Sequence, residues 1–235
     1  MLKGISENVK KKSDLNFGPY GDYDVREAWP PKNFYTYNHH PRYLVNQFSL
    51  RNRLAILSEA FSHERFYQRI FSTYAFATEI QRITKEAEEK TIQTINNEGG
   101  KAKKGVRFKM VPLEQLNDFP TYDYISYTKP DGSKGFYRTG NMIAVDGVTY
   151  HAKFEATVES VLPKGYIIPA ALTGIVENLR KHGIQVAQLT KPITKEGEVF
   201  ELKTFEKQTR KFEGHFLQTA GGTFVPKKQK FSKGD

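Results

Sequence analysis

The stretch SLRNRLAILSEAFSHERFYQRI, residues 49–70, decides how the rest of the chain is interpreted. Residues 54–57 form a short continuous apolar run without a helical period, which is typical of a strand buried on both faces. Ser58 and Glu59 follow directly, and Ser62 is a suitable N-cap for an amphipathic helix. Open α/β sheets keep their functional residues between the carboxyl end of a buried strand and the next helix. Glu59 is therefore the first candidate catalytic residue.

A structural role for Glu59 is an open alternative. The positive end of a helix dipole favours an ionised acid nearby, so Glu59 can serve the helix start alone. It can also pair with Arg51 or Arg53. Arginine and tyrosine side chains near this stretch are candidate substrate-binding groups. A guanidinium binds a carboxylate through two hydrogen bonds, and a phenol donates one hydrogen bond. These candidates are Arg42, Arg51, Tyr37 and Tyr43, and for each arginine an ion pair with Glu59, Glu64 or Asp24 is an equal alternative.

Residues 35–80, YTYNHHPRYLVNQFSLRNRLAILSEAFSHERFYQRIFSTYAFATEI, carry a resemblance to a known family. A PRY segment, a GLRNR-like strand, LSEA and a long helix follow one another as in bacterial zinc carboxypeptidases of the carboxypeptidase A-like metallopeptidase family. Ser49 stands where these proteins have glycine. Residues 17–24 (FGPYGDYD), 163–170 (PKGYIIPA) and 179–192 (LRKHGIQVAQLTKP) are similar to the same subgroup. The resemblance implies an α/β, partial zinc-carboxypeptidase-like fold followed by a small β-rich accessory domain.

The resemblance also implies a chemistry, the removal of C-terminal residues from peptides. It implies Glu59 as general base on zinc-bound water, with zinc held by a His-x-x-Glu motif and a distant histidine. None of the six histidines of the chain (His39, His40, His63, His151, His182 and His215) has a glutamate three residues later. Adjacent residues on a strand point apart, so His39 and His40 are poor co-ligands. We therefore expect no zinc and no peptidase activity in this chain alone.

We interpret the chain as the C-terminal portion of such an enzyme, truncated at both ends. The start, MLKGISENVKKK, lacks the apolar segment of a secretory signal, so any signal peptide is expected upstream of Met1. The family suggests a secreted or periplasmic protein. The expected partners are a peptide substrate and a missing N-terminal half.

Composition limits the remaining alternatives. The 235 residues contain no cysteine, which excludes a disulfide framework and thiolate metal sites. No apolar run approaches the roughly 20 residues of a membrane span. The net charge of +10 is spread over lysine clusters near residues 10, 103 and 228 without a nucleic-acid-binding motif, so nucleic acid is not favoured. The alternative function is a non-catalytic module on the same scaffold that binds peptides or a polyanion.

Pattern changes along the chain indicate three parts. Residues 1–98 are expected to be the catalytic-domain portion, 99–105 a linker and 106–235 an incomplete β-sandwich-like domain. The first part begins with an exposed helix over residues 1–16 and a loop over 17–48, whose aromatic residues either line a pocket or pin the loop to the body. It ends with a helix from Ser62 that stops at residues 96–100. The apolar face of that helix is predicted from Phe66, Ile70, Tyr74, Ala77 and Ile80.

The second half shows short alternating runs typical of strands, with turns between them. Strands are predicted over residues 106–111, 122–128, 135–139, 153–159, 198–205 and 212–219. Turns are predicted at 130–132, at Asp146–Gly147 as a type I′ hairpin, and at Gly221–Gly222. An α/β insert is expected within this half, with a strand over 166–168, a helix over 171–181 and a strand over 184–189.

Overall fold

The computed structural model describes residues 2–51, 53, 55–62, 64–99 and 103–234. The chain divides into two compact units, Met1–Leu162 and Pro163–Asp235, which are treated separately below. The strands form one three-stranded and two two-stranded sheets, so the fold is mixed α/β and strand-rich, as expected at that level. One sheet joins a strand from within residues 1–98 to strands of the second half, and the boundary between the two units falls at residues 162–163. Residues 100–102 of the expected linker lie outside the described residues.

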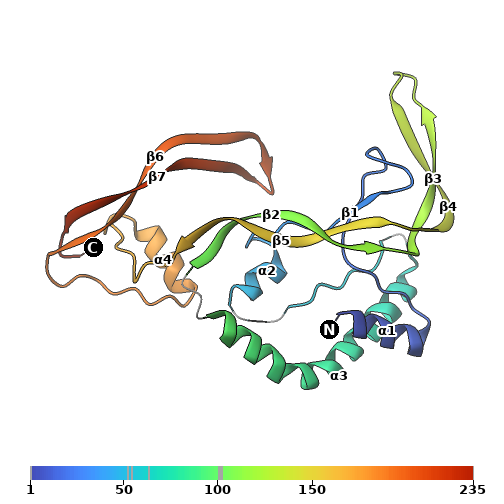
Figure 1. Ribbon diagram of the computed structural model, residues 1–235, viewed down its shortest axis with the longest axis horizontal. Helices are drawn as coiled ribbons and strands as arrows, with labels where there is room; N and C mark the ends of the chain where they lie inside the picture. Colours follow the sequence, from blue (N-terminus) through green and yellow to red (C-terminus); the bar gives the residue numbers. More distant parts are fainter. Residues whose placement is uncertain (1, 52, 54, 63, 100–102, 235) are drawn as a thin grey trace. The chain divides into compact units, whose positions relative to one another are not determined.

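The frame of the first unit is strand β5, Val148–Val161. It pairs antiparallel with β2, Lys103–Leu116, and in parallel with the short β1, Asn33–Tyr35. Phe34 of β1 is buried with Val148 and Tyr150 and forms the core of this sheet. The sheet therefore holds the loop-rich segment before residue 49 by a buried aromatic side chain and by backbone hydrogen bonds. Figure 1 shows β1 beside the ribbon of β2 and β5.

The antiparallel ribbon continues beyond β2 and β5 into β3, Phe119–Thr128, and β4, Lys134–Val145. The predicted type I′ hairpin at Asp146–Gly147 is wrong, because β4 and β5 lie in different sheets and do not pair. This dipeptide instead lies beside Asn117–Asp118 at a corner of the ribbon. The Gly147 amide donates to Asn117 Oδ1 (3.1 Å) and the Asp118 amide to Asp146 Oδ1 (2.8 Å). The turn at 130–132 is confirmed, and Gly132 has φ of 80° there.

Helix α1, Leu2–Ser13, packs against α3, Phe66–Gly99. The expectation of an exposed first helix is wrong, because Ile5 and Val9 lie one turn apart and are buried against Phe76. Among the described residues, none of the helices is long and apolar enough to cross a membrane.

The long helix ends at Gly99 as predicted but begins at Phe66, beyond the expected cap at Ser62. Its buried side also differs from the prediction. Phe66, Ile70 and Tyr74 are 54 to 72% exposed, while Phe76 and Glu79 are buried. The helix is apolar on two sides, and α1 covers the side of Phe76, which the predicted periodicity did not include. Of the predicted face, Ile80 is partly buried against this cluster.

The prediction of a buried strand at 54–57 is wrong for residues 55–57, which the structure describes. Residues 55–57 form no strand, and Leu54 lies outside the described residues. The resemblance implies a GLRNR-like strand that begins at Ser49, but Ser49 is instead the last residue of α2, Leu44–Ser49. A turn follows, in which the backbone amides of Arg51 and Arg53 donate to the Phe48 carbonyl. A strand needs a neighbour to satisfy its amides, and no described strand lies alongside this segment.

The second unit contains α4, Thr173–Lys181, and a ribbon of β6, Ile193–Phe212, and β7, His215–Phe231. The helix predicted over residues 171–181 is confirmed as α4, and Gly183 after it has φ of 75°. The strands predicted at 166–168 and 184–189 are absent from this fully described stretch. The turn predicted at Gly221–Gly222 is wrong, because both glycines lie within β7 and the chain reverses at Glu213–Gly214.

The buried carboxylate of Glu79 on α3 joins the two helices by binding Lys12 and Asn8 of α1, and it also pairs with Arg82 of its own helix. The Glu79 carboxylate lies 2.7 Å from Lys12 Nζ and 2.7 Å from Arg82 Nη2, and Asn8 Nδ2 donates to it at 2.8 Å. Its side chain is only 4% exposed. The hydrogen bonds from Arg82, Lys12 and Asn8 lower the pKa of Glu79 from 4.5 to about 2.

We predict that protonation of Glu79 loosens the helix pair. Because the folded-state pKa is depressed, the stabilisation is fully present above pH 4.5 and is lost as the pH falls toward 2. The midpoint of thermal unfolding, followed by helical circular dichroism, should therefore fall more steeply over this range in the wild type than in Glu79→Gln. Glu7→Gln, at an exposed glutamate of α1, is the control and should behave as the wild type. Equal slopes for wild type and Glu79→Gln would contradict the prediction.

Candidate functional site

The aromatic residues of the segment before α2 fall into two groups. The first group pins the segment to the body through ring contacts with α3, β3 and β5, as one alternative in the sequence analysis proposed. Its members are Phe17 on Phe76 (4.8 Å), Trp29 on Tyr124 (4.9 Å), Tyr23 on Phe119 (6.2 Å) and Phe34 on Tyr150 (5.4 Å). The second group is separate and contains both predicted substrate-binding tyrosines.

This second group is a cluster of Tyr20, Tyr37 and Tyr43, with Arg42 beside it. The Tyr37 ring centroid lies 5.5 Å from that of Tyr20 and 5.4 Å from that of Tyr43, in edge-on arrangements. The Arg42 guanidinium carbon lies 5.4 Å from the Tyr43 ring centroid. The Tyr150 hydroxyl donates to the Tyr20 carbonyl at 3.1 Å, which ties the cluster to β5. The structure thus brings together three of the four predicted binding residues.

Glu59 acts electrostatically on this tyrosine cluster. The pKa of the Tyr20 phenol is raised above its ordinary value of 10.0, first by burial and next by the negative charge of Glu59. Burial and then the neighbouring Tyr20 raise the pKa of Tyr37 in the same direction. Both phenols therefore stay protonated at neutral pH and can donate a hydrogen bond to a ligand oxygen.

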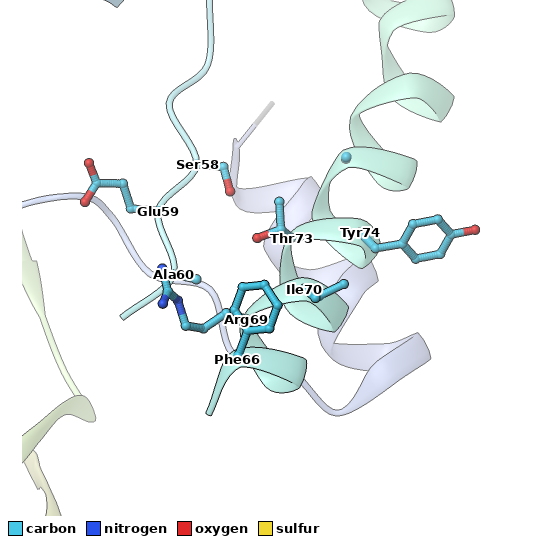
Figure 2. Close-up of a pocket in the computed structure, with 9 residues that line it drawn as sticks. Ser58, Glu59, Ala60, Phe66, Arg69, Ile70, Thr73 and Tyr74 are labelled. Carbon is cyan, nitrogen blue, oxygen red and sulfur yellow. The ribbon is translucent and has the colours of Figure 1, made fainter. Parts of the chain in front are cut away.

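An open pocket of about 710 Å³ lies between α3 and the segment that carries Glu59. Its lining residues are Ser58, Glu59, Ala60, Phe66, Arg69, Ile70, Thr73, Tyr74 and Ala77. Figure 2 shows Arg69 reaching from the helix toward Ala60, while the Glu59 carboxylate points away from the helix. The pocket therefore offers an apolar wall, one guanidinium and one carboxylate at separate places.

Arg69 is a functional candidate that the sequence analysis missed. Its Nε is buried and has no hydrogen-bond partner among the described residues. An unsatisfied donor of this kind costs about 1–3 kcal/mol, so it marks a position where a ligand acceptor would be favourable. The sequence signal was weak, because an arginine three residues after Phe66 looks like an ordinary polar position on an amphipathic helix.

Arg51 is not brought to the pocket. It lies in the turn after α2, where its amide donates to Phe48 O at 3.0 Å, and it is absent from the pocket lining. Arg42, Tyr37 and Tyr43 also lie outside that lining and belong to the tyrosine cluster. The predicted site residues therefore lie in two separate places. Glu59 lines the pocket, and Arg42, Tyr37 and Tyr43 belong to the tyrosine cluster.

The histidine pair offers no metal centre within the described part of the chain. The rings of His39 and His40 stack at 4.9 Å, and His39 also contacts Phe108 and Phe154. Burial, then the proximity of His39 and Arg42, lowers the pKa of His40. Across the described residues, no three His, Cys, Asp or Glu side chains are placed to hold one ion.

Comparison with family models, with curated proteins and with solved structures found no match for this chain. The assignment of a function therefore depends on the geometry around Glu59 and on the resemblance in residues 35–80.

We predict that Arg69→Met leaves the midpoint of thermal unfolding unchanged or raises it by a few degrees. The substitution removes the unsatisfied Nε and keeps an apolar stem of similar length. Arg82→Met on the same helix is the matched comparison, and it should lower the midpoint because it breaks the ion pair with Glu79. Thermal denaturation of the two variants in parallel checks this, and equal destabilisation would show that Arg69 has a structural partner.

Proposed function

We propose that this chain is part of a peptidase of the zinc-carboxypeptidase type, with a partial α/β fold of that family, and that it binds the C-terminal end of a peptide around Glu59. One observation carries the proposal. Glu59 lines a pocket that has an apolar wall and the Arg69 side chain, whose Nε has no partner among the described residues, and its negative charge also raises the pKa of Tyr20 in the tyrosine cluster. A peptide terminus presents matching groups, namely a carbonyl, an apolar side chain and a carboxylate.

Glu59 is the proposed general base toward the attacking water. Among the described residues it has no ion-pair partner, so its carboxylate is available to accept a proton. The hydroxyls of Tyr37 and Tyr43 donate to a substrate carbonyl or carboxylate. Arg42, which lies over the Tyr43 ring, and Arg69, whose Nε has no partner among the described residues, are the proposed groups for the substrate carboxylate.

Zinc, the cofactor that the resemblance implies, does not fit the described residues, because they bring no three ligand side chains together. The peptidase proposal therefore requires metal ligands from a partner segment, which would be the N-terminal half expected from the resemblance. No role in holding zinc is assigned to His39, His40 or any other residue of the described set.

A non-catalytic module that binds peptide termini is the second candidate. The same absence of a ligand set in the described part of the chain favours it, since a pocket with an apolar wall and a cation binds a peptide carboxylate without hydrolysis. The two candidates share the binding step and differ only in turnover.

We predict that the chain alone does not hydrolyse peptides and that activity appears when it is mixed with the N-terminal half of a zinc carboxypeptidase. In that mixture Glu59→Gln should lower kcat by at least about 100-fold, because the general base is removed. Glu64→Gln, five residues later, removes a charge outside the pocket lining and should leave kcat within about twofold. Release of C-terminal residues from a short peptide, followed by chromatography, is the measurement.

Turnover in the mixture separates the two candidates, because both of them bind the peptide. Binding without turnover, in the chain alone and in the mixture, would replace the peptidase proposal by the binding module. Neither binding nor turnover from folded protein would overturn both.

A further inference from the structure

The ribbon of the second unit presents one continuous apolar face. β6 and β7 pair antiparallel over most of their length and are joined by Glu213–Gly214, whose φ values are 48° and 83°. Positive φ at both turn residues is the type I′ arrangement that suits the twist of a two-residue hairpin. Partners directly opposite in such a pair lie on the same face, so the register sorts the side chains.

The register places five large apolar side chains on one face of the ribbon, which we term the aromatic face. Opposite partners are Phe200 with Phe224, Leu202 with Gly222 and Phe205 with Ala220, and Phe216 lies further along β7 at an even-numbered position. The irregularity between Leu202 and Thr204 shifts the alternation of β6 by one residue, which brings Phe205 to the same face as Phe200 and Leu202. The aromatic face therefore consists of Phe200, Leu202, Phe205, Phe216 and Phe224.

These side chains pack on one another but are not covered. The rings of Phe200 and Phe224 lie 5.0 Å apart, and a Cβ at Gly222 would come within 2.8 Å of the Phe200 ring. The five residues nevertheless keep between 37 and 65% of their surface exposed. The opposite face is polar by comparison, with Glu201 opposite Thr223 and Glu206 opposite Thr219. A two-stranded ribbon is marginally stable alone, so burial of the aromatic face would stabilise it.

Two opposite charges share the aromatic face. Glu198 lies beyond Phe200, and Lys207 lies between Phe205 and Phe216. Glu198, opposite Pro226, precedes Leu202 by four residues, and Lys207, opposite Gln218, follows it by five. Lys207 Nζ lies 4.2 Å from the Phe216 ring centroid. Glu196 is paired with Lys228 at 3.6 Å, whereas Glu198 has no ion-pair partner among the described residues. Along β6, Glu198 and Lys207 thus lie nearly symmetrically on either side of the stretch from Phe200 to Phe205.

We propose that the aromatic face is covered by the same face of a second copy of this chain. Two ribbons pack face to face in opposite directions about a two-fold axis near Leu202. Glu198 of each copy then lies against Lys207 of the other, and Phe200 lies against Phe205. A two-fold interface requires a surface complementary to itself, and an apolar centre between one acid and one base meets that condition.

The same charge arrangement argues against other occupants. An anionic lipid surface or a polyanion would attract Lys207 and Lys211 but repel Glu198, because all three side chains project from the same face. A second copy satisfies the charges of Glu198 and Lys207 at once.

Sedimentation velocity of the whole chain over a concentration series tests the proposal. We expect a monomer–dimer equilibrium, with Glu198→Lys and Lys207→Glu each raising the dimer dissociation constant at least about tenfold, since each places like charges together twice. An equimolar mixture of these two variants should form dimers again, because every reversed charge then meets its opposite. Glu201→Lys and Lys195→Glu, on the polar face, are the matched controls and should dimerise as the wild type.

Circular dichroism of each variant confirms that it is folded, and recovery in the mixture provides a second control on folding. A monomeric wild type, equal weakening by the control substitutions, or no recovery in the mixture would overturn the proposal. Association only with vesicles of anionic lipid would also overturn it in favour of a membrane surface. Phe224→Ser should abolish the dimer, and an unchanged dimer would show that the aromatic face is not the interface.

Discussion

The parallel pairing of β1 with β5 is the constraint on which the first unit depends. Phe34, buried with Val148 and Tyr150, joins a three-residue strand to the long central strand. This contact fixes the position of a segment that otherwise has little regular structure. Because Tyr150 also donates to the Tyr20 carbonyl, the same strand holds the tyrosine cluster in place. The candidate site is therefore supported by β5, although Glu59 itself lies in an irregular segment.

Helix α3 connects the core to the pocket. One side packs on α1 through Phe76 and through the ion pairs of Glu79, and another side presents Phe66, Ile70 and Arg69 to the pocket beside Glu59. A helix that is apolar on two sides can bury only the side for which the fold supplies a neighbour. The exposed side is available for a ligand, and this is why the pocket lies there.

Several features were predictable from local pattern. The long helix ending at Gly99, the turn at 130–132 and the helix ending before Gly183 each depend on nearby residues, such as glycines that adopt positive φ. Glu59, Tyr37, Tyr43 and Arg42 were named from the sequence as site candidates, and their roles are still proposals. Arg69 was missed because only the folded helix shows that its Nε is buried without a partner among the described residues.

The errors share one physical cause, which is that pairing between distant segments overrides local signals. Gly221–Gly222 has the composition of a turn, yet Phe200 from the other strand requires a residue without a side chain at Gly222. Asp146–Gly147 has the composition of a hairpin, yet Asn117 and Asp118 make it a corner of a longer ribbon. Residues 55–57 have the composition of a buried strand, yet no described strand lies beside them. The sequence by itself determined which residues prefer helices, strands and turns, because those preferences arise from neighbours along the chain. Only the tertiary structure decided which strands pair, which side of α3 is buried and where the charged groups of the site lie, because those outcomes depend on contacts between residues far apart in the sequence.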